Sequence, residues 1–189
     1  MIARNCRCAR VLCAGLTLGM IASDAVAQRG AQDGEWRHYG GDEANTRYSA
    51  LDQITAGNFS DLELVWRMKT DNFGPEPEYN FESTPLMVGG VVYSTVGTRR
   101  SVVAVDAGTG EYLWMHRLDE GERAAAAPRR LSGRGLAYRD DSTNGGRGQI
   151  IYVTPGYRMI ALDAVTGQRI SSFGTDGVVD LMQNMDQEI

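Results

Sequence analysis

One corner occurs twice in this chain of 189 residues, and it limits the possible folds more than any other feature. The stretch "VVAVDAGTGEYLW" at 102–114 returns as "MIALDAVTGQRIS" at 159–171. The shared letters Asp-Ala-x-Thr-Gly begin at Asp106 in the first copy and at Asp163, 57 residues later, in the second. A unit that is repeated with its order kept indicates a fold built from stacked copies.

The residues around these corners are typical of short antiparallel strands. The stretch "TPLMVGGVVYSTV" holds two apolar runs joined by Gly89-Gly90, which is a hairpin signal. The run "GVVYST" returns as "QIIYVT", with Tyr93 and Tyr152 at the matching position. Within each corner, Asp and Thr can accept hydrogen bonds from nearby backbone NH groups, and Gly provides the left-handed conformation that closes the turn.

Short strands that repeat at roughly forty to fifty residues are typical of β-propeller blades. Trp114 follows the first corner, where its ring could pack between adjacent blades. The second copy has Ser171 at that place, so its packing should differ, and an irregular insertion at about 119–147 separates the copies. Any meandering β-sheet with two similar hairpins is the alternative. The matching upstream strands favour an all-β chain that forms a partial β-propeller.

Residues 1–27 have the organisation of a secretory signal peptide. Three arginines precede the apolar run "VLCAGLTLGMIA", and small residues at Ala25 and Ala27 favour cleavage after Ala27. A membrane anchor is the alternative, but this run is shorter than the roughly twenty residues that a spanning helix needs. Residues 28–35 are predicted to be a flexible linker. A single helical turn is expected near Ser60, before "LELVW".

Cysteine content and charge exclude two further classes of protein. All three cysteines lie within the predicted signal, so the mature chain has none, and packing rather than disulfides must stabilise it. The net charge of the whole chain is −5, and removal of the signal leaves −7. Without a basic cluster the chain is not expected to bind nucleic acid, and its acidic balance favours solubility.

Several stretches, in family order, resemble the quinoprotein dehydrogenases, which are eight-bladed β-propellers that use pyrroloquinoline quinone (PQQ). They are "WRHYGGDEANTRYSALDQI", "ESTPLMVGGVVY", "AVDAGTGEYLW", "GRGLAY", "VTPGYRMIALDAVTG" and "FGTDGVVDL". The resemblance covers essentially all of residues 36–189. It implies that these residues form about two to three blades, as the N-terminal part of a propeller domain, in a periplasmic enzyme that oxidises a CH–OH group.

The resemblance assigns cofactor contacts to two residues. Glu82, just before "STPL", matches the glutamate that contacts the quinone cofactor near its ring edge. Arg134, in "GRGLAY", matches the arginine that binds this planar tricarboxylate, and a guanidinium offers fixed planar donors for it. Without the resemblance, Glu82 would be interpreted as a solvated strand-end carboxylate and Arg134 as part of a solvated basic stretch.

The chain also departs from the family pattern. Enzymes of the methanol- and ethanol-oxidising branch carry adjacent cysteines where this chain has Pro128 and Arg129, which favours a sugar or polyol substrate, as in glucose dehydrogenase. The family's calcium ligands and its catalytic base all map beyond Ile189. No residue of this chain is therefore predicted to be catalytic or to bind metal, and Ca²⁺ is expected only in the full-length enzyme. His38 and His116 are predicted to be turn or surface residues.

The implied reaction passes a hydride from the substrate to the quinone, and electrons then leave to a cytochrome c or a membrane quinone. The alternatives are a PQQ-dependent alcohol dehydrogenase and a non-enzymatic scaffold propeller with the same blade turn. Such a scaffold would have no reason to keep Glu82 and Arg134 in their family contexts. The fragment by itself is expected to be inactive, because it supplies only part of the pocket wall.

Overall fold

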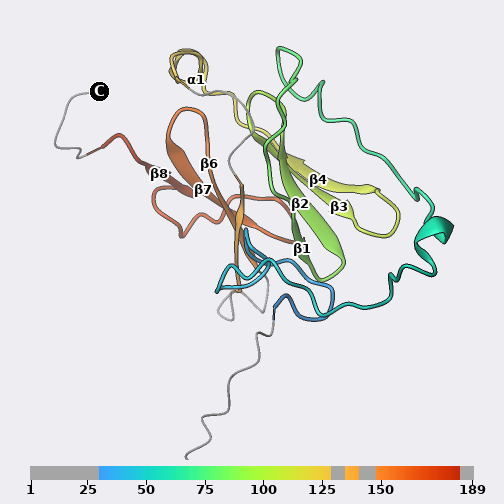
Figure 1. The fold of residues 1–189 in the computed structure, drawn as a ribbon. Coiled ribbons are helices and arrows are strands. Elements are labelled where there is room, and N and C mark those ends of the chain that lie inside the picture. The colour runs from blue at the N-terminus through green and yellow to red at the C-terminus, as the bar shows by residue number, and fades with distance from the viewer. Residues whose placement is uncertain (1–29, 129–134, 141–147, 184–189) are drawn as a thin grey trace, which may run out of the picture.

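The structure is a computed structural model that describes residues 30–128, 135–140 and 148–183. It contains two four-stranded antiparallel sheets, each with its strands in sequence order, and the two sheets lie side by side (Figure 1). The first sheet comprises β1 (Leu86–Val88), β2 (Val91–Val96), β3 (Ser101–Asp106) and β4 (Tyr112–His116). The second comprises β5 (Ala137–Arg139), β6 (Gln149–Val153), β7 (Arg158–Asp163) and β8 (Val178–Asp180). The short helices are η1 (Phe59–Asp61) and α1 (Glu122–Ala125).

The two sheets are the predicted blades. Gly89 and Gly90, with φ of 57° and 79°, form the two-residue turn between β1 and β2, where Val88 pairs with Val91. The left-handed conformation at both turn positions is the geometry that suits the twist of a hairpin. The repeated corners join β3 to β4 in the first blade and follow β7 in the second.

Both corners have the hydrogen bonding that the sequence predicts. Asp106 Oδ1 accepts from Gly108 N, Thr109 N and Thr109 Oγ1, at 3.0, 2.8 and 2.9 Å. In the second corner, Asp163 Oδ1 accepts the equivalent hydrogen bonds from Val165 N, Thr166 N and Thr166 Oγ1, at 3.0, 2.8 and 3.0 Å. One carboxylate thereby satisfies three donors that a tight turn would otherwise leave to water.

The hydrophobic core lies between the blades and within their middle strands. Strands β3 and β7 read as almost continuous apolar runs, because neighbouring elements cover both of their faces. The buried cluster draws residues from both blades, so the two sheets share one core. Its members include Leu86, Tyr93, Val102, Ala104, Leu136, Ile150, Tyr152, Ile160 and Leu162.

Trp114 forms the seam between the blades, as the repeat analysis predicts. Its Nε1 donates to the Ala164 carbonyl at 3.0 Å, and its ring covers Gly167, where a Cβ would lie only 2.5 Å from Trp114 Cε3. The buried Tyr93 hydroxyl donates to the same carbonyl at 3.1 Å. Two donors from the first blade therefore meet one backbone acceptor at the corner of the second.

A second tryptophan repeats this contact at the other side of the first blade. Trp66 Nε1 donates to the Ala107 carbonyl at 2.9 Å, and a Cβ on Gly110 would lie 2.7 Å from the Trp66 ring. Residues 62–70 are extended and belong to no strand of either sheet. Their position relative to the first blade is the position that β4 has relative to the second blade. They therefore correspond to the outermost strand of a further blade. The prediction of two to three blades is confirmed.

Two segments differ from the sequence expectation. The insertion predicted to be irregular contains α1 and also β5, the first strand of the second blade. The strand after the second corner is split: Ile170 N donates to Ala161 O at 3.0 Å, and the chain then turns away before β8 pairs with the start of β7. The turn-rich stretch between them, with Gly174 and Gly177 at positive φ, explains the interruption.

The segment before the first blade lies across one end of both blades, the end at which the β1–β2 turn lies. Trp36 and Met87 exchange backbone hydrogen bonds of 2.8 and 3.0 Å, which extends the sheet at β1. Ala31, within the predicted linker, is buried and donates to Tyr48 O at 2.8 Å. Arg37 joins the two blades: it contacts Glu35, whose other oxygen accepts from Gly89 N, and it donates to both oxygens of Asp140 at 2.9 and 2.8 Å.

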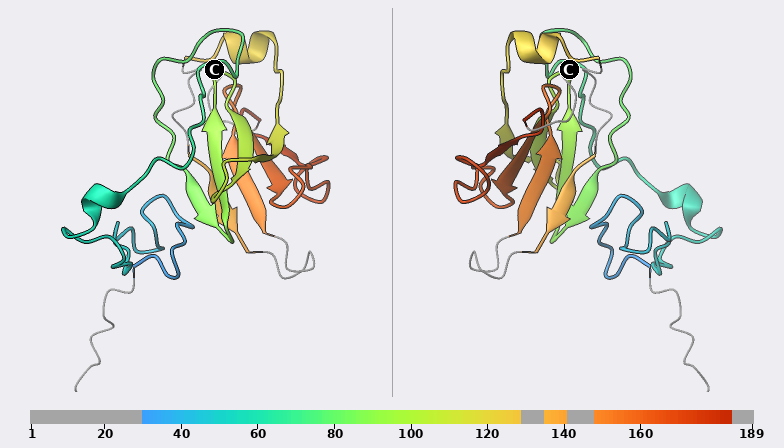
Figure 2. Two further views of the ribbon diagram at one scale, coloured as in Figure 1. Left: turned by 90° about the vertical axis from the view of Figure 1, so that its right-hand side faces the viewer. Right: turned by 90° about the vertical axis from the view of Figure 1, so that its left-hand side faces the viewer.

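The two ends of the blades are therefore occupied by different segments. Both Asp-x-x-Thr-Gly corners lie at one end of the blades, together with the N-terminal segment that contains Trp36. At the other end lie α1 and residues 74–84 (Figure 2). In the part of the chain that the structure describes, no helix combines the length and apolar character needed to cross a membrane.

Candidate cofactor-facing edge

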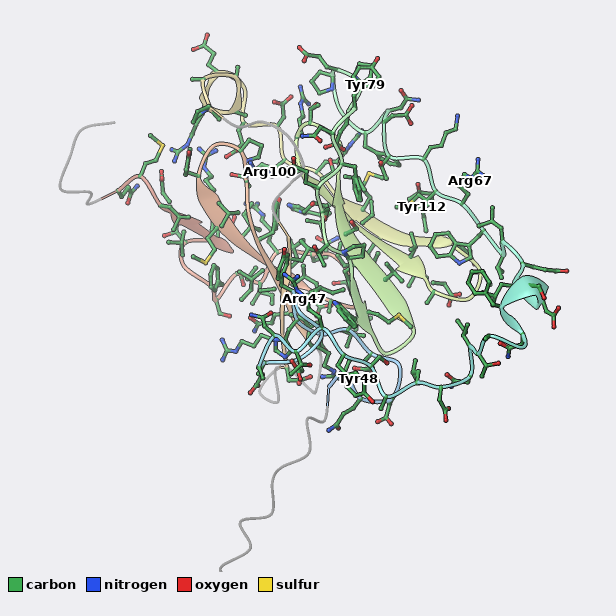
Figure 3. All side chains as sticks on the ribbon, in the orientation of Figure 1. Arg47, Tyr48, Arg67, Tyr79, Arg100 and Tyr112 are labelled. Atoms are coloured by element: carbon green, nitrogen blue, oxygen red, sulfur yellow. The ribbon has the colours of Figure 1, made fainter. Side chains whose placement is uncertain are left out.

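Glu82 lies in the extended segment that leads into β1, at the α1 end of the first blade. Its side chain is exposed, and Oε1 accepts a hydrogen bond from Asn80 Nδ2 at 2.8 Å. Within the described residues, Asn80 is the hydrogen-bond donor to this carboxylate, and no donor contacts Oε2. Tyr79, 90% exposed, projects from the same segment (Figure 3).

Ser83 anchors the backbone next to Glu82. Its Oγ accepts from the hydroxyl of Thr95 at 2.8 Å, and Ser94 Oγ lies 3.3 Å away. Thr95 is fully buried in β2, the strand next to β1. The residue beside the exposed carboxylate is thus attached to the interior of the blade, which restricts where the carboxylate can move.

Arg134, the second predicted contact, lies outside the described residues, so its side chain is not placed here. Its neighbour Gly135 is described, and a Cβ built on it would lie 4.0 Å from the Thr84 carbonyl, in ordinary van der Waals range. Leu136, which follows, is buried in the shared core. The structure therefore brings together the segment that contains Glu82 and the residue after Arg134, at the points where both blades begin.

The segment between the blades is held by a buried carboxylate that the sequence analysis missed. The side chain of Glu120 is only 1% exposed. Its oxygens accept from Arg158 Nη1 at 2.6 Å, Thr154 Oγ1 at 3.0 Å and Gly156 N at 2.8 Å. Thr154 and Gly156 belong to the turn between β6 and β7, and Arg158 begins β7, so Glu120 anchors the start of the α1 segment to the second blade.

Arg123 completes this clamp. Its Nε donates to the Gly156 carbonyl at 2.6 Å, Nη1 donates to Asp180 Oδ2 at 2.8 Å, and Nη2 contacts the other oxygen of Asp180. The guanidinium of Arg123 lowers the pKa of the Asp180 carboxyl to about 2. Nothing in the local sequence distinguishes Glu120 and Arg123 from surface charges, since their partners are more than thirty residues away.

The residues at this edge fit part of a cofactor pocket. An exposed carboxylate on an anchored backbone can accept a hydrogen bond from a planar polar ligand, and Gly135 has only the Thr84 carbonyl within 4.0 Å of the place where a Cβ would be. Among the described residues, no three His, Cys, Asp or Glu side chains form a group that could hold a metal ion. The location of the calcium ligands stays a prediction.

The two histidines do not lie at this edge. His38 lies in a tight turn, where it pairs with Gly41 in an isolated bridge. His116 lies on β4 and is half-buried, with its ring 6.0 Å from that of Tyr152. The prediction of a turn or surface position is therefore wrong for His116, because β4 faces the second blade rather than solvent at this point.

The chain resembles known proteins along most of its length. The family model described as "PQQ: Glucose/ethanol/alcohol dehydrogenase, beta-propeller domain" matches residues 36–189. The glycerol dehydrogenase large subunit of Gluconobacter oxydans (strain 621H) is 30% identical over 164 residues, which cover 82% of this chain and 22% of that protein. The 1-butanol dehydrogenase (cytochrome c) of Thauera butanivorans is 36% identical over 142 residues, which cover 74% and 18%.

A solved structure gives the same result for the fold. The quinohemoprotein alcohol dehydrogenase from Comamonas testosteroni superposes with a TM-score of 0.59 at 26% identity, over 81% of this chain and 20% of that one. The chain thus spans about a fifth of the length of the relatives that it matches. With its two antiparallel blades and the match over residues 36–189, the chain belongs to the PQQ-dependent dehydrogenases, in whose β-propeller domain it forms adjacent blades.

Proposed function

We propose that this chain forms one wall of the PQQ pocket of an exported dehydrogenase that oxidises a CH–OH group. The approach of Gly135 to the Thr84 carbonyl supports this proposal best, since it brings the segment of Glu82 and the residue after Arg134 to one edge of two adjacent blades. Bound PQQ would supply a quinone that accepts two electrons from the substrate.

Each residue at the edge would have a separate task. Glu82 would accept a hydrogen bond from the rim of the cofactor through Oε2, while Asn80 holds Oε1. Arg134 would offer planar donors to a carboxylate or quinone oxygen and stabilise negative charge there. The buried anchors of Ser83 and Glu120 would keep these groups in place before the cofactor arrives.

The substrate is proposed to be a sugar or a polyol. Pro128 and Arg129 stand where enzymes for simple alcohols carry adjacent cysteines, which supports this choice. The printed names of the relatives include both a glycerol dehydrogenase and a 1-butanol dehydrogenase, so an alcohol remains the second candidate. Oxidation rates of the full-length enzyme with glucose, glycerol, ethanol and 1-butanol would distinguish the two classes.

Location and electron transfer follow from the same family. The signal-like residues 1–27 support export to the periplasm, with cleavage after Ala27. A cytochrome c or a membrane quinone would then receive the electrons, and the name of the Thauera relative supports the cytochrome. Since the chain spans about a fifth of its relatives, it would bind PQQ weakly and would not turn over substrate alone.

Titration of residues 28–189 with PQQ, followed by tryptophan fluorescence, tests the proposed wall. Glu82→Gln and Arg134→Ala should each weaken binding about tenfold or more, because a hydrogen bond to a charged group contributes about 1.5–3 kcal/mol. Glu111→Gln, at the first corner, and Arg67→Ala, at the position that Figure 3 labels, change exposed residues and should leave the affinity unchanged. Equal affinity for all five proteins would refute the assignment, and failure of the unmodified chain to bind PQQ would favour a scaffold propeller.

A further inference from the structure

His116 occupies an unusual place in the seam between the blades. The backbone of Gly167, in the corner of the second blade, hydrogen-bonds its imidazole, and the ring lies edge-on to Tyr152 at 73°. The remaining nitrogen, Nε2, is buried and has no hydrogen-bond partner within the described residues. A neutral imidazole tolerates this arrangement, because an unprotonated nitrogen leaves only an unused acceptor.

His116 and Trp114 act on the same corner. They are two residues apart on β4, so their side chains project from the same face of the strand. Trp114 covers Gly167 and donates to Ala164, while His116 hydrogen-bonds to the Gly167 backbone. The outermost strand of the first blade therefore holds the corner of the second through two adjacent side chains.

The charges around the imidazole do not favour a proton on it. Arg169, which follows the corner, is the charged side chain that acts on His116 within the described residues. Arg169 forms an ion pair with Asp176 at 3.3 Å, and no carboxylate is among the described groups that shift the pKa of His116. Tyr152 presents a buried phenol on β6, whose pKa is raised by burial, and Glu120 beyond it is paired with Arg158.

We infer that His116 is a pH-sensitive latch between the two blades. A proton on Nε2 places a positive charge and an unpaired N–H in the buried seam, opposite a second cation at Arg169. The protonated side chain gains hydration and separation from Arg169 when the corner moves away from β4. Acidification therefore weakens the contact of the first blade with the second, and it does so with no effect on the strands within each blade.

The direction of the pH dependence follows from burial. Burial and the charge of Arg169 lower the pKa of His116 from its ordinary value of 6.5, against the opposing effect of the hydrogen bond that the imidazole donates to the Gly167 backbone. The unfolded chain then binds a proton that the folded seam does not, so the stabilisation is complete above pH 6.5 and is lost as the pH falls through the folded pKa. One proton changes the unfolding constant by at most tenfold per pH unit.

The other tryptophan contact provides an internal control. "ELVWRM" at 63–68 corresponds to "EYLWMH" at 111–116, so Met68 stands where the other segment has His116. Met68 does not titrate in this range. The contact of Trp66 with the first blade should therefore be insensitive to mild acid, while the contact of Trp114 with the second should weaken.

NMR spectroscopy of residues 28–189 between pH 8 and pH 5 tests the latch. The chain has two histidines, so spectra of His38→Gln and His116→Met assign both imidazole signals. We expect a pKa below 6.5 for His116 and a loss of protection of the Trp114 indole on acidification, with that of Trp66 constant. In His116→Met, the protection of Trp114 should become independent of pH, while His38→Gln should behave as the unmodified chain.

Three results would overturn the inference. The first is a measured pKa of His116 at or above 6.5. The second is an equal loss of protection of the Trp66 and Trp114 indoles. The third is an unchanged pH dependence in His116→Met. If that variant does not fold, the first two measurements still decide the question, because both use the unmodified chain.

Discussion

Gly167 offers a direct test of the seam between the blades. Its φ is +69°, and an added Cβ would lie 2.5 and 2.6 Å from Trp114 Cε3 and Cδ2. Substitution by alanine therefore has two costs, one from the backbone conformation and one from the ring. Gly90 has a similar φ of +79°, but an added Cβ would meet nothing within 4 Å, so Gly90→Ala has the first cost alone.

The two costs can be estimated separately. An L-residue in the left-handed region costs about 1–2 kcal/mol relative to glycine, which applies to both variants. Forcing an extra methyl group into a packed contact costs about 1–3 kcal/mol more, which applies only to Gly167→Ala. The free energy of unfolding should thus fall by about 2–5 kcal/mol in Gly167→Ala and by about 1–2 kcal/mol in Gly90→Ala.

Urea unfolding, followed by far-UV circular dichroism, measures both values. Gly167→Ala should also be rescued in part by Trp114→Ala, because the alanine then has no ring to displace. In the Trp114→Ala variant, the loss of unfolding free energy caused by Gly167→Ala should approach the loss caused by Gly90→Ala. Equal destabilisation by Gly167→Ala and Gly90→Ala in the unmodified chain would refute the claim that the ring packs on this corner.

Three further predictions concern single side chains. Asp106→Ala should destabilise the first corner, and since hydrogen bonds from Thr109 lower the pKa of Asp106, the stabilisation should persist at neutral pH and disappear as the pH falls below 3.8, measured by acid unfolding. Tyr93→Phe should cost about 1 kcal/mol through its lost hydrogen bond. Burial raises the pKa of Tyr93 to about 12, so an absorbance titration of the variant should show one late-titrating phenol fewer than the unmodified chain, whose stability should fall above pH 10. Glu120→Gln should cost about 2 kcal/mol by leaving Arg158 without its charge partner, and should speed tryptic cleavage of the α1 segment.

The corners could be predicted from the sequence because their hydrogen bonds are local. Asp106 and Thr109 are three residues apart, and the three bonds to Asp106 Oδ1 depend on nothing outside the turn. The role of Trp114 required one further step, since its partner lies in the next repeat. The repetition makes this partner predictable, because two repeated units that stack on each other need a large side chain to pack between them.

The remaining features depend on contacts between distant segments. Glu120 and Arg158 are 38 residues apart, and no local pattern relates them. β5 could not be predicted because a strand of three residues is too short for its alternation to stand out in the sequence. The role of Trp66 has a weaker signal in the sequence: "ELVW" repeats "EYLW" of the first blade, but no Asp-x-x-Thr-Gly corner precedes it.

The structure separates the residues that join the blades from those that would meet the cofactor. The first corner lies beside the β1–β2 turn, where Ala107 N donates to Gly90 O at 2.9 Å, while Glu82 lies before the opposite end of β1. The blade between them is a four-stranded sheet whose middle strands, β2 and β3, are mostly buried. A corner substitution should therefore lower stability without changing PQQ affinity of the folded fraction, and Glu82→Gln should do the reverse. The two properties can vary independently because different ends of the same strands determine them.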